Sequence, residues 1–206
     1  MGKVIGNFFA FLYSLDSLRT IALNATNIVT DRGGKLKPVY IAVLGSGSQC
    51  SKENQINAFQ IGQELAKSGA VTLSGGLSGI FAYAFEGAKE QGGQTIAILG
   101  EATEPPVPSK NCDHILTTGI GLAKHSIIAN VCDGAIVIEG WLGTLALISE
   151  FLTLKKHVVL LENSGGIAST LINRPLIDGS DILLEHYNSA EKCVQGVMNK
   201  INMENK

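Results

Sequence analysis

Three glycine-containing turns hold the residues of this chain that could bind or transform a ligand. The turns span residues 45–48, 74–79 and 139–144, and each follows a short apolar run. Glycine at the end of a buried strand lets the backbone come close to a ligand, and the N–H groups at the start of a following helix hold anions such as phosphate. In the third turn, EGWLGT, Gly143 and Thr144 stand where the next helix is expected to begin. We therefore expect an anion to bind there.

The familiar nucleotide-binding motifs are incomplete in this sequence. The turn GSGSQC begins like a dinucleotide fingerprint but has Cys50 in the place of the third glycine. The second apolar run ends in Ser74 and Gly75 rather than in the acid that would hold a ribose hydroxyl. The sequence also contains no Gly-Lys-Ser/Thr tripeptide and no Gly-x-Ser-x-Gly elbow. NAD binding in its usual mode, a Walker A site and a serine hydrolase are therefore disfavoured.

Composition and charge limit the classes of partner. The chain has 206 residues, of which 45% are hydrophobic and 17% charged, as in a globular domain. Its net charge is −2 and its Lys and Arg residues form no cluster, so no nucleic-acid partner is expected. The four cysteines, at positions 50, 112, 132 and 193, lack the spacing of a metal site or of a disulfide framework. We expect free thiols, no metal and a cytoplasmic location.

Residues 1–37 are expected to form an N-terminal extension made of an amphipathic helix and a linker. Its apolar side chains recur at helical spacing, at Phe8, Phe11, Leu12, Leu15 and Leu18. Ser14 and Asp16 interrupt the apolar run, which is too short to span a bilayer, so no membrane partner is expected. The polar, glycine-containing stretch DRGGKLKP precedes the main domain, expected over residues 38–206.

In residues 38–206, apolar runs alternate with segments of helical periodicity. The apolar runs predict strands within 39–45, 70–76, 94–100, 114–118, 134–140 and 157–162, and a short one after 181. The periodic segments predict helices over 52–67, 79–91, 121–132 and 142–156, and a closing helix, with a surface loop over 169–180. This alternation predicts a single α/β domain, Rossmann-like and doubly wound, with a mainly parallel sheet and helices on both faces.

Two glycine-containing segments at matching spacing carry a resemblance to a known family. They are LSGGLSGIFAYAFEGAKEQGGQTIAIL and TTGIGLAKHSIIANVCDGAIVIEGWLGTL. Together they resemble the molybdenum-cofactor carrier proteins and the related Lonely Guy phosphoribohydrolases, over roughly residues 39–162 and the closing strand and helix. The resemblance implies a Rossmann-like homodimer or homotetramer that binds a phosphorylated small molecule. The ligand, molybdenum cofactor or a nucleoside monophosphate, stays open.

The resemblance also implies which residues contact the ligand. The family's first glycine loop falls on residues 74–79, its threonine-glycine element on 118–119, and its final Gly-Gly-x-Gly-Thr loop on 140–144. With the turn after the first strand, the candidate ligand-binding residues are Gly45, Ser46, Gly75, Gly76, Gly79, Thr118, Gly119, Lys124, Glu139, Gly140, Trp141, Gly143 and Thr144.

Two departures from the hydrolases argue against catalysis. Lys124 stands where they have an arginine, which keeps a positive charge but loses the bidentate fork. Leu147 stands where they have a glutamate, and leucine can neither stabilise a charge-deficient sugar carbon nor activate water. Glu150 lies too far along the helix, and on a different face, to replace that glutamate, so a salt bridge is expected for it. We therefore predict no catalytic residues and a protein that holds its ligand.

Several roles stay open at the level of sequence. Glu139 either binds a ligand hydroxyl or amine or caps the start of the following helix. Trp141, the only tryptophan, either stacks on a ligand ring, covers the loop or an interface, or occludes the site. His125 is expected to be structural, because no partner acid can be named for it. A nucleoside 5′-monophosphate phosphoribohydrolase and a ligand-free oligomeric scaffold remain the alternative functions.

Overall fold

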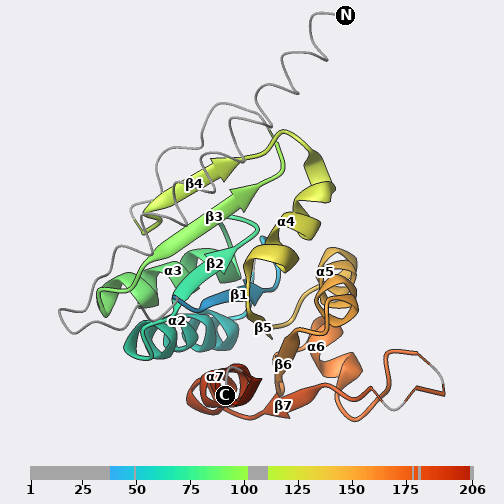
Figure 1. The fold of residues 1–206 in the computed structure, drawn as a ribbon. Helices are drawn as coiled ribbons and strands as arrows, with labels where there is room; N and C mark the ends of the chain where they lie inside the picture. Colours follow the sequence, from blue (N-terminus) through green and yellow to red (C-terminus); the bar gives the residue numbers. More distant parts are fainter. Residues whose placement is uncertain (1–37, 49, 102–110, 178, 181, 205–206) are drawn as a thin grey trace, which may run out of the picture.

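The computed structural model describes residues 38–48, 50–101, 111–177, 179–180 and 182–204. In this part of the chain, strands in the order β4-β3-β2-β1-β5-β6-β7 form one sheet, and all neighbours pair in parallel (Figure 1). The strands are β1 (Tyr40–Leu44), β2 (Val71–Ser74), β3 (Thr95–Leu99), β4 (His114–Thr117), β5 (Gly134–Val137), β6 (His157–Leu161) and β7 (Glu185–Tyr187). The predicted Rossmann-like, doubly wound α/β domain is confirmed.

Helices cover both faces of the sheet and enclose two apolar cores. Ile41 and Val43 of β1 pack in the core beneath α2 (Lys52–Lys67), α3 (Ile80–Glu90) and α7 (Ala190–Glu204). Ala42 and Leu44 belong to the other core, beneath α4 (Lys124–Val131), α5 (Leu142–Thr153) and α6 (Gly166–Leu171). Successive side chains of a strand point to opposite faces, and a strand buried on both faces therefore reads as a continuous apolar run.

Two glycines bring α2 and α3 into backbone contact. A Cβ atom on Gly62 would lie 1.9 Å from the carbonyl oxygen of Ala84, and one on Gly87 would lie 1.9 Å from that of Phe59. Ser51 is the N-cap residue of α2, and its hydroxyl accepts a hydrogen bond from the backbone N–H of Asn54. The close packing of the two helices holds the turns after β1 and β2 next to each other.

The strands on either side of β1 end at the same level. Ala42 of β1 pairs with Leu73 of β2, and Leu44 pairs with Val137 of β5. The carboxyl ends of these three strands, and the glycine turns that follow them, therefore meet at one edge of the sheet. None of the helices in the described residues is long and apolar enough to cross a bilayer.

Some of the observed elements differ from the predicted ones. The helix predicted over 121–132 is a 3-10 turn, η1 (Gly121–Ala123), that leads into α4. The surface loop predicted over 169–180 is wrong at its start, because α6 includes residues 169–171 and buries Leu171. The helix is difficult to predict from the sequence because two glycines, Gly165 and Gly166, stand at its beginning, and both have positive φ. The predicted N-terminal extension, 1–37, lies outside the described residues.

Candidate functional site

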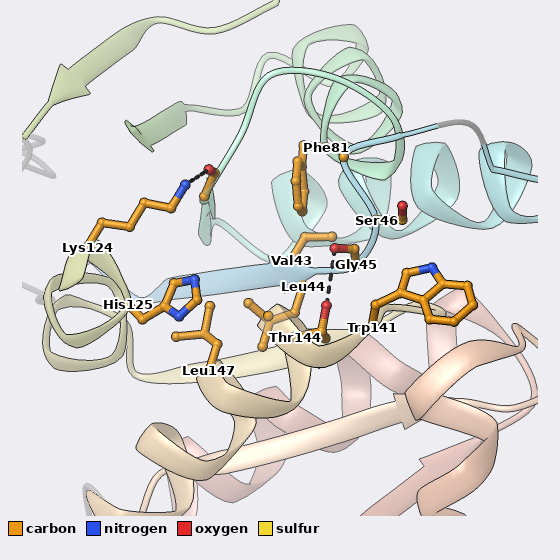
Figure 2. Close-up of a pocket in the computed structure, with 13 residues that line it drawn as sticks. Val43, Leu44, Gly45, Ser46, Phe81, Lys124, His125, Trp141, Thr144 and Leu147 are labelled. Carbon is orange, nitrogen blue, oxygen red and sulfur yellow. Dashed lines mark hydrogen bonds between the residues drawn. The ribbon is translucent and has the colours of Figure 1, made fainter. Parts of the chain in front are cut away.

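A cleft opens where the sheet reverses its winding. Strand β1 pairs with β2 on one side and with β5 on the other, so the sheet grows in opposite directions from β1. This arrangement creates a crevice at the carboxyl ends of β1 and β5. The cleft measures about 240 Å³ and is built from the turns after β1, β2 and β5 and from α3, α4 and α5 (Figure 2). Its lining consists of Val43, Leu44, Gly45, Ser46, Gly47, Gly75, Phe81, Lys124, His125, Trp141, Gly143, Thr144 and Leu147.

The start of α5 forms one wall of this cleft. Thr144 is buried and its hydroxyl donates to the carbonyl oxygen of Gly45, at 3.3 Å (Figure 2). A Cβ atom on Gly140 would lie 2.6 Å from the Thr144 side chain, so only glycine allows the turn to fold against the helix. The first N–H groups of a helix have no partner within the helix and carry its partial positive charge. With Gly143 and Thr144 in the wall, the cleft is equipped to hold an anion.

Lys124 approaches the cleft from the opposite side. Its ammonium group donates to the carbonyl oxygen of Gly75, at 2.6 Å, and so joins α4 to the turn after β2 (Figure 2). Burial lowers the pKa of Lys124, and the nearby carboxylate of Glu101 opposes this. An ammonium group has three N–H donors, and among the described residues Lys124 uses one of them in the bond to Gly75.

Leu147 and His125 lie between Lys124 and Thr144. Leu147 is only 5% exposed and lines the cleft, so the position of the hydrolase glutamate is an apolar part of the wall. His125 also lines the cleft, although the sequence suggested a structural role. Burial lowers the pKa of His125, the charge of Lys124 lowers it further, and Glu150 raises it. Glu150, one turn beyond Leu147 on α5, is thus the carboxylate whose charge acts on His125.

Trp141 stands at the mouth of the cleft. It is the residue before α5, and its side chain lines the cleft while remaining 69% exposed. Figure 2 shows the indole beyond Thr144 rather than among the side chains of Lys124, His125 and Leu147. The ring therefore does not fill the cleft. A flat ligand group that extends out of the cleft on this side would contact the indole ring of Trp141.

Glu139 lies outside the cleft lining and fixes the turn after β5. Its backbone has φ of 58°, a left-handed conformation that is uncommon for a residue other than glycine. The backbone N–H of Glu139 donates to the hydroxyl of Ser164, and its carboxylate accepts from the side-chain amide of Asn54 at 3.3 Å. Asn54 is in the first turn of α2, so the carboxylate lies near the start of that helix. The turn is thereby held to α2 and to the loop before α6.

Gly76, Gly79 and Gly140 also contribute to the frame of the site rather than to its lining. Gly79 has φ of 59°, and a Cβ atom there would lie 2.4 Å from the carbonyl oxygen of Ser46. A Cβ atom on Gly76 would lie 2.6 Å from the ring of Phe81. These glycines allow the turns after β1 and β2 to pack together. Ligand contacts by their backbones remain a prediction.

Thr118 and Gly119 lie farther away, at the end of β4. The hydroxyl of Thr118 donates to the carbonyl oxygen of Leu99, at 2.8 Å, and its side chain is buried. Strand β4 is at the edge of the sheet, with β3 and β2 between it and β1. The structure therefore does not bring these two residues to the lining of the cleft.

Seven of the predicted ligand-binding residues line the cleft, and sequence reasoning missed others that do. The residues brought together are Gly45, Ser46, Gly75, Lys124, Trp141, Gly143 and Thr144. Phe81 is one of the missed residues, and the glycines of the preceding turn were the available signal that its ring covers this turn. For His125, the signal was the adjacent Lys124, because the two are the first residues of the same helix.

Comparison with known proteins shows the family. Residues 38–194 match the SLOG cluster4 family, which is well over half of the chain. The chain belongs to the SLOG cluster4 family. This match confirms the relationship indicated by the two glycine-containing segments.

Related proteins share the fold of this SLOG cluster4 member. The molybdenum cofactor binding protein of the phototrophic bacterium Rippkaea orientalis is 31% identical, with a TM-score of 0.71, over 81% of this chain and 99% of that one. The molybdenum cofactor carrier protein of Chlamydomonas reinhardtii is 27% identical, with a TM-score of 0.66, over 80% of this chain and 99% of that one. An uncharacterized protein from Archaeoglobus fulgidus is 32% identical over 127 residues, 62% of this chain and 82% of that protein.

Proposed function

We propose that this protein binds a phosphorylated small ligand, of the molybdenum cofactor or nucleoside monophosphate type, and does not cleave it. One observation carries the proposal. Lys124 and the start of α5 meet in one cleft, and none of the described residues that line this cleft carries a carboxylate. The similarity to proteins described as binding or carrying molybdenum cofactor supports the same class of ligand.

The phosphate is proposed to rest between the two positive elements of the cleft. The N–H groups around Gly143 and Thr144 would donate to its oxygens, as helix starts do in other phosphate sites. The ammonium group of Lys124 would contribute charge from the side of Gly75. The backbone of the turn after β1, at Gly45 and Ser46, forms the floor between them.

The proposal that the ligand is not cleaved rests on Leu147. Cleavage of an N-glycosidic bond develops positive charge on the sugar carbon, and a carboxylate beside that carbon stabilises the charge or activates water. Leu147 offers methyl groups at the corresponding part of the wall. Glu150 does not line the cleft, and Glu139 is engaged with Asn54.

The body of the ligand is proposed to extend toward Trp141. The cleft volume of about 240 Å³ lies below the ~300–1,000 Å³ typical of sites that enclose a whole small molecule. A nucleotide or a pterin phosphate would therefore place its phosphate inside and its flat ring at the mouth. Phe81 and the exposed indole of Trp141 offer aromatic surfaces for that ring. The residues present thus fit both ligand types.

Titration calorimetry tests the proposal. The full chain would be titrated with nucleoside monophosphates and with molybdopterin, and Lys124→Ala would serve as the site variant. We expect binding of at least one of these ligands that the variant weakens. Lack of binding at millimolar concentrations of every one of them would contradict the proposal and favour the ligand-free scaffold.

We also propose a cytoplasmic homo-oligomer. All four cysteines are free thiols, which is consistent with a reducing compartment. A shallow groove on α2 and α3 exposes Ile56 to 57% and also includes Phe59 and Tyr83. Apolar groups gathered on a surface favour association with another protein surface. A second copy of the chain, in a homodimer or homotetramer, is the proposed occupant.

A further inference from the structure

We propose that His125 is a proton-dependent ligand of the bound phosphate, neutral in the free protein and protonated when a dianionic group binds beside Lys124. The inference rests on the proposed function, because it concerns the same cleft. It assigns a second ligand group to the phosphate, one that the sequence had suggested to be structural.

The position of His125 supports this role. Lys124 and His125 are the first two residues of α4, and both line the cleft. Figure 2 shows the imidazole between Lys124 and Leu147, on the side of the cleft that faces Thr144. A phosphate between Lys124 and the start of α5 would therefore have the imidazole as a neighbour. Among the described residues lining the cleft, these two are the only side chains able to carry positive charge.

The surroundings of His125 favour its neutral form in the free protein. Burial lowers the pKa of His125, and the adjacent Lys124 lowers it further. Glu150, from α5, is the one opposing charge, and Glu101 acts on Lys124. The start of a helix also disfavours a cation, so the location in α4 acts in the same direction. These effects together favour the neutral imidazole in the free protein.

A dianion changes this balance. Its negative charge favours the imidazolium form, so binding raises the pKa of His125 and a proton is taken up from solvent. Lys124 and protonated His125 together neutralise two negative charges, as a phosphate monoester carries when fully ionised. A phosphodiester or a carboxylate carries one charge, which Lys124 alone can neutralise. The cleft therefore favours a terminal phosphate group.

Histidine NMR on the full chain tests this proposal. The ring signal of His125 would be assigned in the wild-type protein through its own backbone signals and titrated between pH 5 and pH 8, with sodium chloride and with sodium sulfate at equal ionic strength. Sulfate is the probe because its charge is constant over this range. We expect saturating sulfate to raise the pKa of His125 by about one unit, which corresponds to tenfold tighter binding to the protonated protein.

Calorimetry with the same probe supplies the second readout. Sulfate is expected to bind the wild-type protein about tenfold more tightly at pH 5.5 than at pH 8, and His125→Gln is expected to remove this difference. His114→Gln is the matched control, because His114 is exposed on β4, outside the cleft lining.

The outcomes separate the two proposals. Sulfate binding that is weakened by Lys124→Ala but leaves the pKa of His125 unchanged would overturn the role of His125 and keep the proposed function. Failure of sulfate to bind at any pH would also overturn the role of His125, whereas the proposed function would be contradicted only if the nucleoside monophosphates and molybdopterin failed to bind as well. Because the NMR titration uses the wild-type protein, the result does not depend on whether His125→Gln folds.

Discussion

Leu147 is the residue on which the proposal of binding without cleavage rests. It occupies the wall between His125 and Thr144, where a carboxylate would be needed for hydrolysis, and it is 5% exposed. The positive charge of the site is retained by Lys124, 2.6 Å from the carbonyl oxygen of Gly75. At the scale of residues, the described lining of the cleft therefore offers a positive charge and no carboxylate, which is the basis of the proposed function.

Replacement of Lys124 by alanine should weaken phosphate binding. A hydrogen bond to a charged group contributes about 1.5–3 kcal/mol, so the affinity for AMP or sulfate should fall about ten- to a hundredfold. Calorimetry on Lys124→Ala measures this loss. Lys192→Ala, an exposed lysine on α7, is the matched control and should bind as the wild type does. Equal losses in both variants would argue against a specific contact by Lys124.

The stability of the free protein should depend on His125 in mildly acidic solution. The pKa of His125 is lowered in the folded state, so protonation favours the unfolded chain. Its stabilising effect is therefore complete above the unfolded pKa of about 6.5 and decreases as the pH falls below it. Urea unfolding between pH 7.5 and pH 5 should show a steeper loss for the wild type than for His125→Gln. Parallel curves would contradict the lowered pKa.

At the scale of elements, Gly79 lets the turn after β2 pack closely against the turn after β1. Gly79 has positive φ and no room for a Cβ atom beside the carbonyl oxygens of Ser46 and Ser48. The carbonyl of Ser46 also accepts from the N–H of Ile80, at 3.0 Å, which ties the first turn to the start of α3. A side chain at Gly79 would therefore push apart two turns that form the cleft.

Gly79→Ala should destabilise the fold and weaken ligand binding. Backbone strain and the steric clash together should cost roughly 3 kcal/mol or more. Gly92→Ala is the control, because Gly92 also has positive φ but its Cβ atom would meet nothing within 4 Å. This control should lose only about 1–2 kcal/mol and keep its ligand affinity. Chemical unfolding with calorimetry separates the two effects, and equal behaviour of the variants would refute the role of the turn contact.

Most helices and strands could be predicted from the sequence, whereas the contacts between them could not. Helix α2 is predicted with its observed bounds, because its apolar spacing is regular and Ser51 caps it. Helix α6 is missed, because two glycines precede it and it is only six residues long. The role of Glu139 also escapes prediction, since Asn54 and Ser164 are distant in sequence and meet it only in the folded chain.

At the scale of the whole molecule, the strand order brings the site together. Gly45, Gly75 and Thr144 follow β1, β2 and β5, and the parallel arrangement places the ends of these three strands at one edge (Figure 1). Lys124 reaches the same cleft from the start of α4. Residues 118–119 resemble the family's motif but follow the edge strand β4, outside the cleft lining. Spacing in the sequence identifies which turns carry glycines, and only the topology decides which of them share a cleft.

A charged residue on the α2–α3 groove should break the proposed oligomer. Ile56→Glu is expected to convert it to monomers, because burying the new carboxylate at an interface is unfavourable. Ile56 is 57% exposed, so the stability of the monomer should change little. Leu154→Glu, at the end of α5 on the other side of the sheet, is the control. Light scattering coupled to size-exclusion chromatography measures the mass, and an unchanged oligomer in Ile56→Glu would exclude this groove as the interface.

The most direct test of binding without cleavage incubates AMP with the full chain. Phosphorus NMR reports whether the phosphate of AMP is bound, and chromatography of the same sample reports whether adenine is released. We expect the phosphorus signal to shift with wild-type protein and to stay at its free position with Lys124→Ala, while AMP remains intact in both. Release of free adenine by the wild type, abolished in Lys124→Ala, would contradict this account and show a phosphoribohydrolase.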